Sequence, residues 1–137
     1  MKRKMDTGSG VKKVPGQRKE GRLTAPSGDP ERENFYSFIL DNMLVGCHIL
    51  GFDLRYIYLN KTAELHDRFP AAEVLGRKFA DIWPGIESSI VYREIDRCLK
   101  ERCVTHFENR WFYPDGTDKW FNISIQPIPE GVLVLTF

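Results

Sequence analysis

The first regular pattern of hydrophobic and polar positions begins near residue 30 and has the period of an α-helix. Phe35, Phe38 and Ile39 recur at the three- and four-residue spacing that places side chains on one helix face. Asp29 can accept hydrogen bonds from the free N–H groups of a first turn, and Pro30 suits the first helical position. The pattern therefore predicts an N-terminal flanking helix over residues 30–44 with a broad apolar stripe.

Short strands and short helices follow this helix. Strands are predicted over 46–52 and 56–60, helical segments over 61–67 and 70–76, a turn or short helix over 77–85, a longer helix over 86–102, and strands over 104–113, 118–129 and 132–137. The short links between neighbouring strands read as hairpins, which makes those strands antiparallel. This order predicts an α+β fold, in which one antiparallel sheet carries its helices on one face.

The longest predicted strand has two chemically different faces. Alternate side chains point to opposite faces of a strand, so Phe121, Ile123 and Ile125 share one face. Trp120 lies on the other face, together with polar residues of the same strand. We expect the uniformly apolar face to pack against the helices, where Trp111 of the preceding strand matches it across the hairpin.

Charge is unevenly distributed along the 137 residues. Residues 1–30 hold eight Lys and Arg against three Asp and Glu, a balance of +5, whereas residues 31–137 hold twelve against sixteen, a balance of −4. Residues 1–29 also contain few hydrophobic side chains, which predicts a disordered basic tail. The mildly acidic remainder disfavours nucleic-acid binding by the folded domain.

The cysteines, histidines and apolar runs indicate the cellular compartment and bear on metal and membrane binding. Cys47, Cys98 and Cys103 are an odd number without a CxxC pair, which predicts free thiols in the cytoplasm. Cysteines and histidines this scattered predict no metal site. The longest apolar runs are shorter than the roughly 20 residues that span a bilayer, so no membrane partner is expected for this segment. Because the last strand runs to residue 137, we expect the chain to be part of a longer protein.

Three segments carry the most specific spacing in the chain. They read VGCHILGFDLRYIYLN at 45–60, AAEVLGRKFADIWPG at 71–85 and ENRWFYPDGTDKWFNISIQPIPEGVLVLTF at 108–137. Their order and spacing resemble the PAS domain family. The resemblance implies a PAS domain over 45–137 with a five-stranded antiparallel sheet and short helices on one face. Leu54 departs from the family, which often has glycine in the first hairpin turn.

The resemblance also implies a function. PAS domains act as sensor or signal-transduction modules of larger regulatory proteins such as histidine kinases of two-component systems, σ54-type transcriptional activators and cyclic-dinucleotide enzymes. We expect a small ligand to bind in the pocket between sheet and helices. The signal of its binding would be relayed through the flanking helices. The alternative is a ligand-free dimerisation or docking module with a filled core. No enzyme is expected, since the sequence contains no recognisable catalytic triad and no phosphate-binding loop.

Two cofactors of the family are disfavoured at particular positions. Its flavin-binding light sensors carry a reactive cysteine at the position of Phe79 and amide side chains at those of Trp111 and Phe121. Its haem-binding members place a histidine on the long helix, whereas segment 86–102 contains none. We therefore expect neither flavin nor haem, and the identity of any cofactor stays open.

The candidate pocket is aromatic, with two polar contacts. Its expected residues are His48, Tyr58, Phe79, Trp83, Asn109, Trp111, Phe121 and Ile123. These rings could wall a ligand cavity or simply fill the core, where aromatic residues are common. The sequence does not fix which face of its strand His48 occupies, and we expect His66 at the surface.

A second set of apolar residues forms the expected partner surface. It comprises Phe35, Phe38 and Ile39 of the flanking helix and Trp120, Leu133, Leu135 and Phe137 of the outer sheet face. A large apolar patch on an open sheet needs a cover. The flanking helix or a second copy of the domain could supply it, which predicts a homodimer whose output domain lies elsewhere in the full-length protein.

Overall fold

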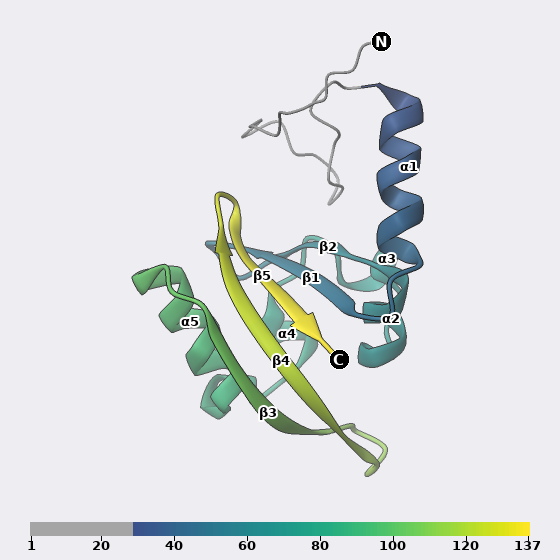
Figure 1. Ribbon diagram of the computed structural model, residues 1–137. Helices are drawn as coiled ribbons and strands as arrows, with labels where there is room; N and C mark the ends of the chain where they lie inside the picture. The colour runs from purple at the N-terminus through teal and green to yellow at the C-terminus, as the bar shows by residue number, and fades with distance from the viewer. Residues whose placement is uncertain (1–28) are drawn as a thin grey trace.

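A computed structural model describes residues 29–137, and the predicted disorder of the basic tail concerns residues that lie almost wholly outside this range. The elements are α1 (Pro30–Asp41), β1 (Gly46–Gly51), β2 (Tyr56–Leu59), α2 (Lys61–Asp67), α3 (Ala71–Val74), α4 (Phe79–Ile82), the 3-10 turn η2 (Ile86–Ser88), α5 (Ile90–Glu101), β3 (Thr105–Phe112), β4 (Asp118–Ile128) and β5 (Gly131–Thr136). Their order follows the predicted one (Figure 1).

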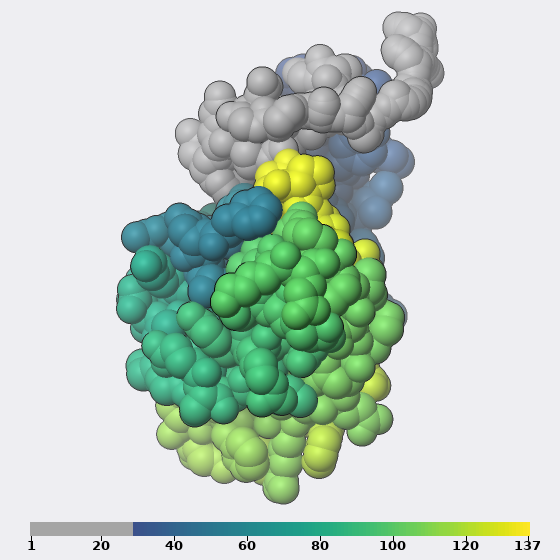
Figure 2. Space-filling model, turned by 90° about the vertical axis from the view of Figure 1, so that its left-hand side faces the viewer, coloured from purple at the N-terminus to yellow at the C-terminus, as the bar shows by residue number. Residues whose placement is uncertain are grey.

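The five strands form one antiparallel sheet in the order β2-β1-β5-β4-β3. The last strand of the chain therefore lies between the first strand and β4. Helices α2 to α5 lie on one face of this sheet, which confirms the predicted α+β arrangement (Figure 1). On the helical side the segments coloured teal to green cover the sheet (Figure 2).

The core lies between the inner face of the sheet and the helices. Leu50, Ile125 and Val132 project from three strands and are almost fully buried, as is Ile95 of α5. The inward set on β4 is the predicted one, because Phe121, Ile123 and Ile125 are all buried.

Helix α5 begins later than predicted. The Ser89 hydroxyl accepts a hydrogen bond from the Tyr92 N–H at 3.1 Å and caps the helix, while the Ser89 backbone is extended. Residues 86–88 form a separate 3-10 turn after Gly85, whose φ is +86°. The predicted continuous helix over 86–102 was therefore wrong in its first turn, because Gly85 and Ser89 interrupt the helical backbone.

The turn between β1 and β2 keeps its shape without glycine. Leu54 has a φ of +64°, in the left-handed region that glycine adopts at little cost. The Leu54 N–H donates to the Gly51 carbonyl at 2.9 Å and closes the turn. The departure from the family pattern at this position is thus accommodated by the backbone.

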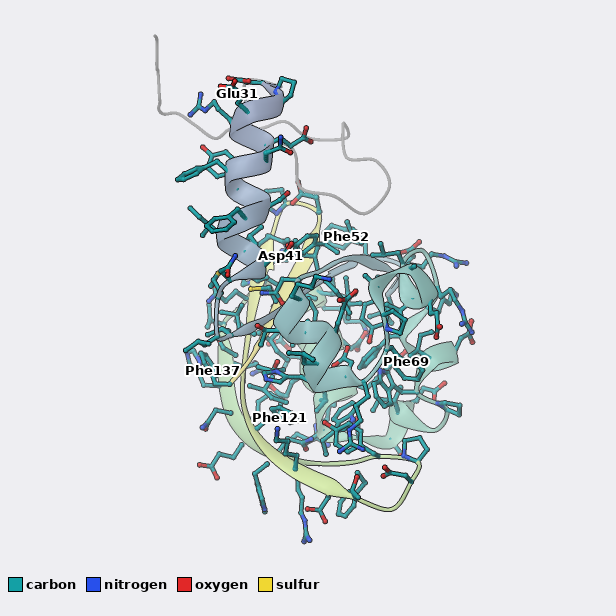
Figure 3. The ribbon with its side chains drawn as sticks, turned by 90° about the vertical axis from the view of Figure 1, so that its right-hand side faces the viewer. Glu31, Asp41, Phe52, Phe69, Phe121 and Phe137 are labelled. Atoms are coloured by element: carbon teal, nitrogen blue, oxygen red, sulfur yellow. The ribbon has the colours of Figure 1, made fainter. Side chains whose placement is uncertain are left out.

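Helix α1 starts as predicted but does not cover the sheet. The Asp29 carboxylate accepts a hydrogen bond from the Glu31 N–H at 2.9 Å, and the helix ends at Asp41 rather than at residue 44. None of its residues is buried, and Phe38 is 65% exposed. The helix rises from one end of the sheet, with Glu31 at its far end (Figure 3). Within one chain, α1 therefore does not supply the expected cover of the sheet.

The outer face of the sheet carries exposed apolar side chains. Trp120 is 62% exposed and Phe137 53%, whereas Leu133 and Leu135 are partly buried. Phe137 lies on the side of the sheet away from the helices and Phe69 (Figure 3). Trp120 and Phe137 are thus exposed on this face, and α1 does not cover them.

Candidate functional site

A small cavity of about 40 Å³ lies between the inner face of the sheet and the helices. Its walls come from all five strands and from α2, α4 and α5. The lining residues are His48, Leu50, Tyr56, His66, Asp67, Phe79, Trp83, Val91, Ile95, Trp111, Phe121, Ile123, Val134 and Thr136. Since about 10–15 Å³ is enough to hold one water, the cavity has room for roughly three.

Aromatic rings form the apolar wall of the cavity. Trp83 meets Trp111 edge to face, with ring centroids 4.8 Å apart. The Trp83 indole N–H also donates a hydrogen bond of 3.0 Å to the hydroxyl of Tyr56, whose ring packs at 5.9 Å on Phe79. These contacts hold each ring by a specific neighbour, so the wall is preorganised.

A buried ion pair forms the polar end of the cavity. His48 Nε2 lies 3.1 Å from Asp67 Oδ1, and His48 Nδ1 lies 3.2 Å from the Val134 carbonyl oxygen. Both neighbours are acceptors, so both ring nitrogens are satisfied only when the imidazole carries two protons. Burial acts to lower the pKa of His48, but the Asp67 carboxylate and the hydrogen bonds to Asp67 and Val134 outweigh it and raise that pKa.

His66 completes the polar end, where sequence reasoning expected a surface residue. Its Nδ1 lies 2.7 Å from the Thr136 hydroxyl, and its ring packs on Phe121 with centroids 4.9 Å apart. Burial, followed by the charges of His48 and Lys119, lowers the pKa of His66. The expected surface position was wrong, because the last turn of α2 packs against β4 and β5. His66 therefore lies beside the His48–Asp67 pair with a pKa below its ordinary value.

Trp111 supplies a hydrogen-bond donor that has no acceptor. Its indole Nε1 is buried and finds no partner among residues 29–137. An unpaired buried donor costs about 1–3 kcal/mol. Trp111 also lines the cavity, so the unpaired donor belongs to a wall residue of the candidate site.

The structure brings together most of the predicted pocket residues and separates two of them. His48, Phe79, Trp83, Trp111, Phe121 and Ile123 line the cavity. Tyr58 does not, because it pairs with Ile49 on the outer face and lines a cleft of about 270 Å³ between α1 and α2. Asn109 lies beyond the Trp83–Trp111 wall, in an outer groove of about 390 Å³.

Sequence reasoning missed the residues that make the polar end. Asp67, His66 and Thr136 come from the end of α2 and from β5, and none belongs to a motif. The one usable signal is the alternation of β5, which puts Thr136 on the same face as Val132 and Val134. The structure also settles the open orientation of His48, which points inward.

A five-stranded antiparallel sheet with helices on one face and a cavity between them is the architecture of a small sensory domain. The chain belongs to the PAS fold family, whose sequence model matches residues 40–137. PAS domains are in general sensory modules, and they occur in sensor histidine kinases. Among curated proteins, none matches the sequence.

Solved structures agree with this assignment. The chain resembles a domain of a sensory box sensor histidine kinase/response regulator from Geobacter sulfurreducens, with a TM-score of 0.62 and 16% identity over 77% of this chain and 92% of that one. A LOV protein from Rhodobacter sphaeroides matches with a TM-score of 0.60 and 14% identity, over 80% of this chain and 67% of that one. The photoactive yellow protein domain of the sensor histidine kinase Ppr from Rhodospirillum centenum matches with a TM-score of 0.61 and 16% identity, over 72% of this chain and 94% of that one. At these identities, the likeness establishes the fold.

The cavity is small compared with the pockets that hold large ligands. Pockets for drug-sized ligands measure about 300–1,000 Å³, far more than the 40 Å³ found here. Phe79, Trp111 and Phe121 line the cavity with apolar rings, and α5 contains no histidine. Among residues 29–137, no group of three His, Cys, Asp or Glu could hold a metal ion. Within the same range, no helix is long and apolar enough to cross a membrane.

Proposed function

We propose that this PAS domain is a non-catalytic sensory module that binds a ligand of a few heavy atoms in the inner cavity. The observation that carries the proposal is one cavity lined both by Trp111, whose indole N–H has no partner within residues 29–137, and by the buried His48–Asp67 pair. Unsatisfied donors and buried charges are costly in a core that serves packing alone. A binding site explains why both occur around one cavity.

The polarity of the walls selects the chemistry of the ligand. The donor on Trp111 favours an acceptor oxygen such as a carbonyl, while Thr136, His66 and Asp67 offer both acceptors and donors at the other end. Aromatic rings line the space between the two ends. A small polar molecule with a carbonyl oxygen and a short apolar body matches this distribution.

Native mass spectrometry of the purified chain tests the proposal. We expect a fraction of the chain to carry a small bound mass, and Trp111→Phe to lose most of it because the donor is gone. Trp120→Phe is the matched control, since the same change at an exposed outer position should leave the bound fraction unaltered. A bare wild-type chain, or equal retention by both variants, would refute ligand binding.

The small cavity volume favours a second candidate, a docking and dimerisation module with a filled core. The surface for it would be the outer sheet face with Trp120 and Phe137, joined by the exposed apolar side chains of α1. We propose a homodimer that covers both, as part of a larger signalling protein. Light scattering should show a dimer that becomes a monomer in Trp120→Glu. Phe52→Glu, an equally exposed position at the far turn, should leave the dimer intact.

The proposed setting is the cytoplasm. Cys47, Cys98 and Cys103 are free thiols in the structure, as expected for a protein in a reducing compartment. The ligand-binding and docking functions are compatible, because they use opposite faces of the same sheet.

A further inference from the structure

Helix α2 connects the cavity to the flanking helix α1. It has seven residues, which corresponds to a length of about 10 Å. Its last two residues, His66 and Asp67, line the cavity. Its N-cap and first residue contact the end of α1, and its second residue contacts the segment that follows α1. A single short helix therefore touches both places that a sensor has to link.

The cavity end of α2 is held by hydrogen bonds from three other segments. Asp67 pairs with His48 of β1 at 3.1 Å, and His66 contacts Thr136 of β5 at 2.7 Å. The hydroxyl of Tyr113, after β3, donates to the His66 carbonyl. Each of these contacts would change if a ligand or a proton altered the polar end of the cavity.

The opposite end of α2 is fastened to α1 by Asn60, the N-cap residue. The Asn60 Oδ1 accepts from the Ala63 N–H and the Cys47 N–H, both at 2.9 Å. Its Nδ2 donates to the Leu40 carbonyl at 2.7 Å and to the Val45 carbonyl at 3.0 Å. With the side chain fully buried, all of its donors and both acceptor sites are used. The amide thus joins α1, β1 and α2 at one point.

Two further bonds complete this junction. The Lys61 N–H donates to the Asp41 carboxylate at 3.2 Å, and the Thr62 hydroxyl donates to the Met43 carbonyl at 2.5 Å. Asp41 marks the end of α1 nearest the domain in Figure 3. Because no residue of α1 is buried, the orientation of this helix depends mainly on its last turn and the segment that follows.

We propose that α2 is the coupling element of this domain: a change at the His48–Asp67 end of the cavity shifts α2 and loosens or re-aims α1 through Asn60. The proposal specifies how the sensory function proposed above is transmitted, and it rests on that function only for its biological meaning. The mechanical link itself does not require a ligand.

Hydrogen–deuterium exchange on the full chain tests the link without any ligand. Asp67→Ala removes the contact with His48, and we expect amides of residues 38–43 and of α2 to exchange about fivefold faster. Amides of β3 and β4 should be unchanged. Asp96→Ala is the matched control, since it removes an exposed carboxylate paired with Lys100 on α5.

A second variant separates coupling from general destabilisation. Tyr113→Phe removes only the hydroxyl that donates to the His66 carbonyl, and it should speed exchange at the same amides to a smaller extent. Faster exchange confined to the cavity end of α2 in both variants, with residues 38–43 unchanged, would overturn the proposal. A uniform rise over all peptides in both variants would overturn it as well.

The link must also act in reverse, because coupling between two sites is reciprocal. Thr62→Val keeps the shape of the side chain and removes its hydrogen bond to the Met43 carbonyl. We expect faster exchange at the cavity end of α2 in this variant, and protection equal to wild type there would count against coupling. Since no arm uses a ligand, an absence of bound mass in the spectrometric test would leave this result standing.

Discussion

The His48–Asp67 pair gives the domain a pH-dependent stability that Asp67→Asn should reverse. In the wild type, His48 donates from both ring nitrogens, to Asp67 at 3.1 Å and to the Val134 carbonyl at 3.2 Å. An asparagine amide at position 67 can donate to a neutral imidazole whose Nδ1–H still bonds Val134. In the variant, both ring nitrogens of His48 therefore have hydrogen-bond partners when the imidazole is neutral, with one proton fewer than in the wild type.

The size and sign of the effect follow from these two arrangements. Hydrogen bonds to charged groups contribute about 1.5–3 kcal/mol and neutral ones about 0.5–1.5 kcal/mol, so the substitution should cost about 1–2 kcal/mol where His48 is charged. Because the pKa of His48 is raised in the folded wild type, this stabilisation is complete below the unfolded pKa of about 6.5. It is lost as the pH rises through the folded pKa, which lies above that value.

The variant should respond in the opposite direction. Without the carboxylate, burial is the main influence on His48 and lowers its pKa below the unfolded value. Stability of Asp67→Asn should therefore fall as the pH is lowered. His66, whose pKa is lowered by burial first, adds a slope of the same sign as the variant below pH 6.5. Because the charges of His48 and Asp67 also act on the pKa of His66, the difference between the two curves reports on this group of three residues together.

Urea unfolding followed by tryptophan fluorescence measures this difference. We expect Asp67→Asn to be about 1–2 kcal/mol less stable than wild type near pH 6 and close to wild type near pH 8.5. Asp96→Asn, on the exposed face of α5, should show a small cost at both pH values. An equal cost of Asp67→Asn at both values, or a larger cost at the alkaline one, would refute the charged state assigned to His48.

Two pairs of matched substitutions test the packing of the domain by the same unfolding assay. Ser124→Ala should stabilise the fold by about 1 kcal/mol, because the buried Ser124 hydroxyl has no hydrogen-bond partner within residues 29–137. Ser89→Ala should destabilise the fold by about 1 kcal/mol, because the hydroxyl that caps α5 is lost. Stability changes of the same sign in both variants would contradict this reasoning. Gly131→Ala should cost about 3 kcal/mol of stability, because the added Cβ would lie 2.1 Å from the Leu50 carbonyl oxygen. Gly116→Ala should cost about 1 kcal/mol, because no atom lies within 4 Å of its Cβ position and only the backbone conformation is disfavoured. Similar costs at both glycines would show that the sheet adjusts at this point.

Local chemistry explains which parts of the fold could be predicted from the sequence. The start of α1 was predictable because Asp29 and Pro30 act within one turn, and the faces of β4 followed from strict alternation. The break before α5 was not, because residues 86–102 keep a helical spacing of apolar side chains. Only the extended backbone at Ser89 and its capping bond separate the 3-10 turn from the helix.

Only some of the residues that line the cavity could be predicted from the sequence, and Tyr58 illustrates the physical reason. Simple alternation from Tyr56 would place Tyr58 on the inner face. A register shift in the β1–β2 pairing instead sets Tyr56 opposite Leu50 and Tyr58 opposite Ile49, so these two tyrosines face opposite sides. A bulge of one residue cannot be read from composition or period, and it moves every later side chain of the strand to the other face.

The polar end shows a second limit, set by distance along the chain. His48 and Asp67 are 19 residues apart and His66 and Thr136 are 70 apart, so each pair forms only when α2 has packed against the strand that carries its partner. Periodicity identifies which residues of one element share a face, but it does not say which residue of another element comes opposite. Trp120 and Phe121 mark where sequence reasoning is strongest, since neighbours on one strand must face opposite ways: one ring is 62% exposed and the other 6%.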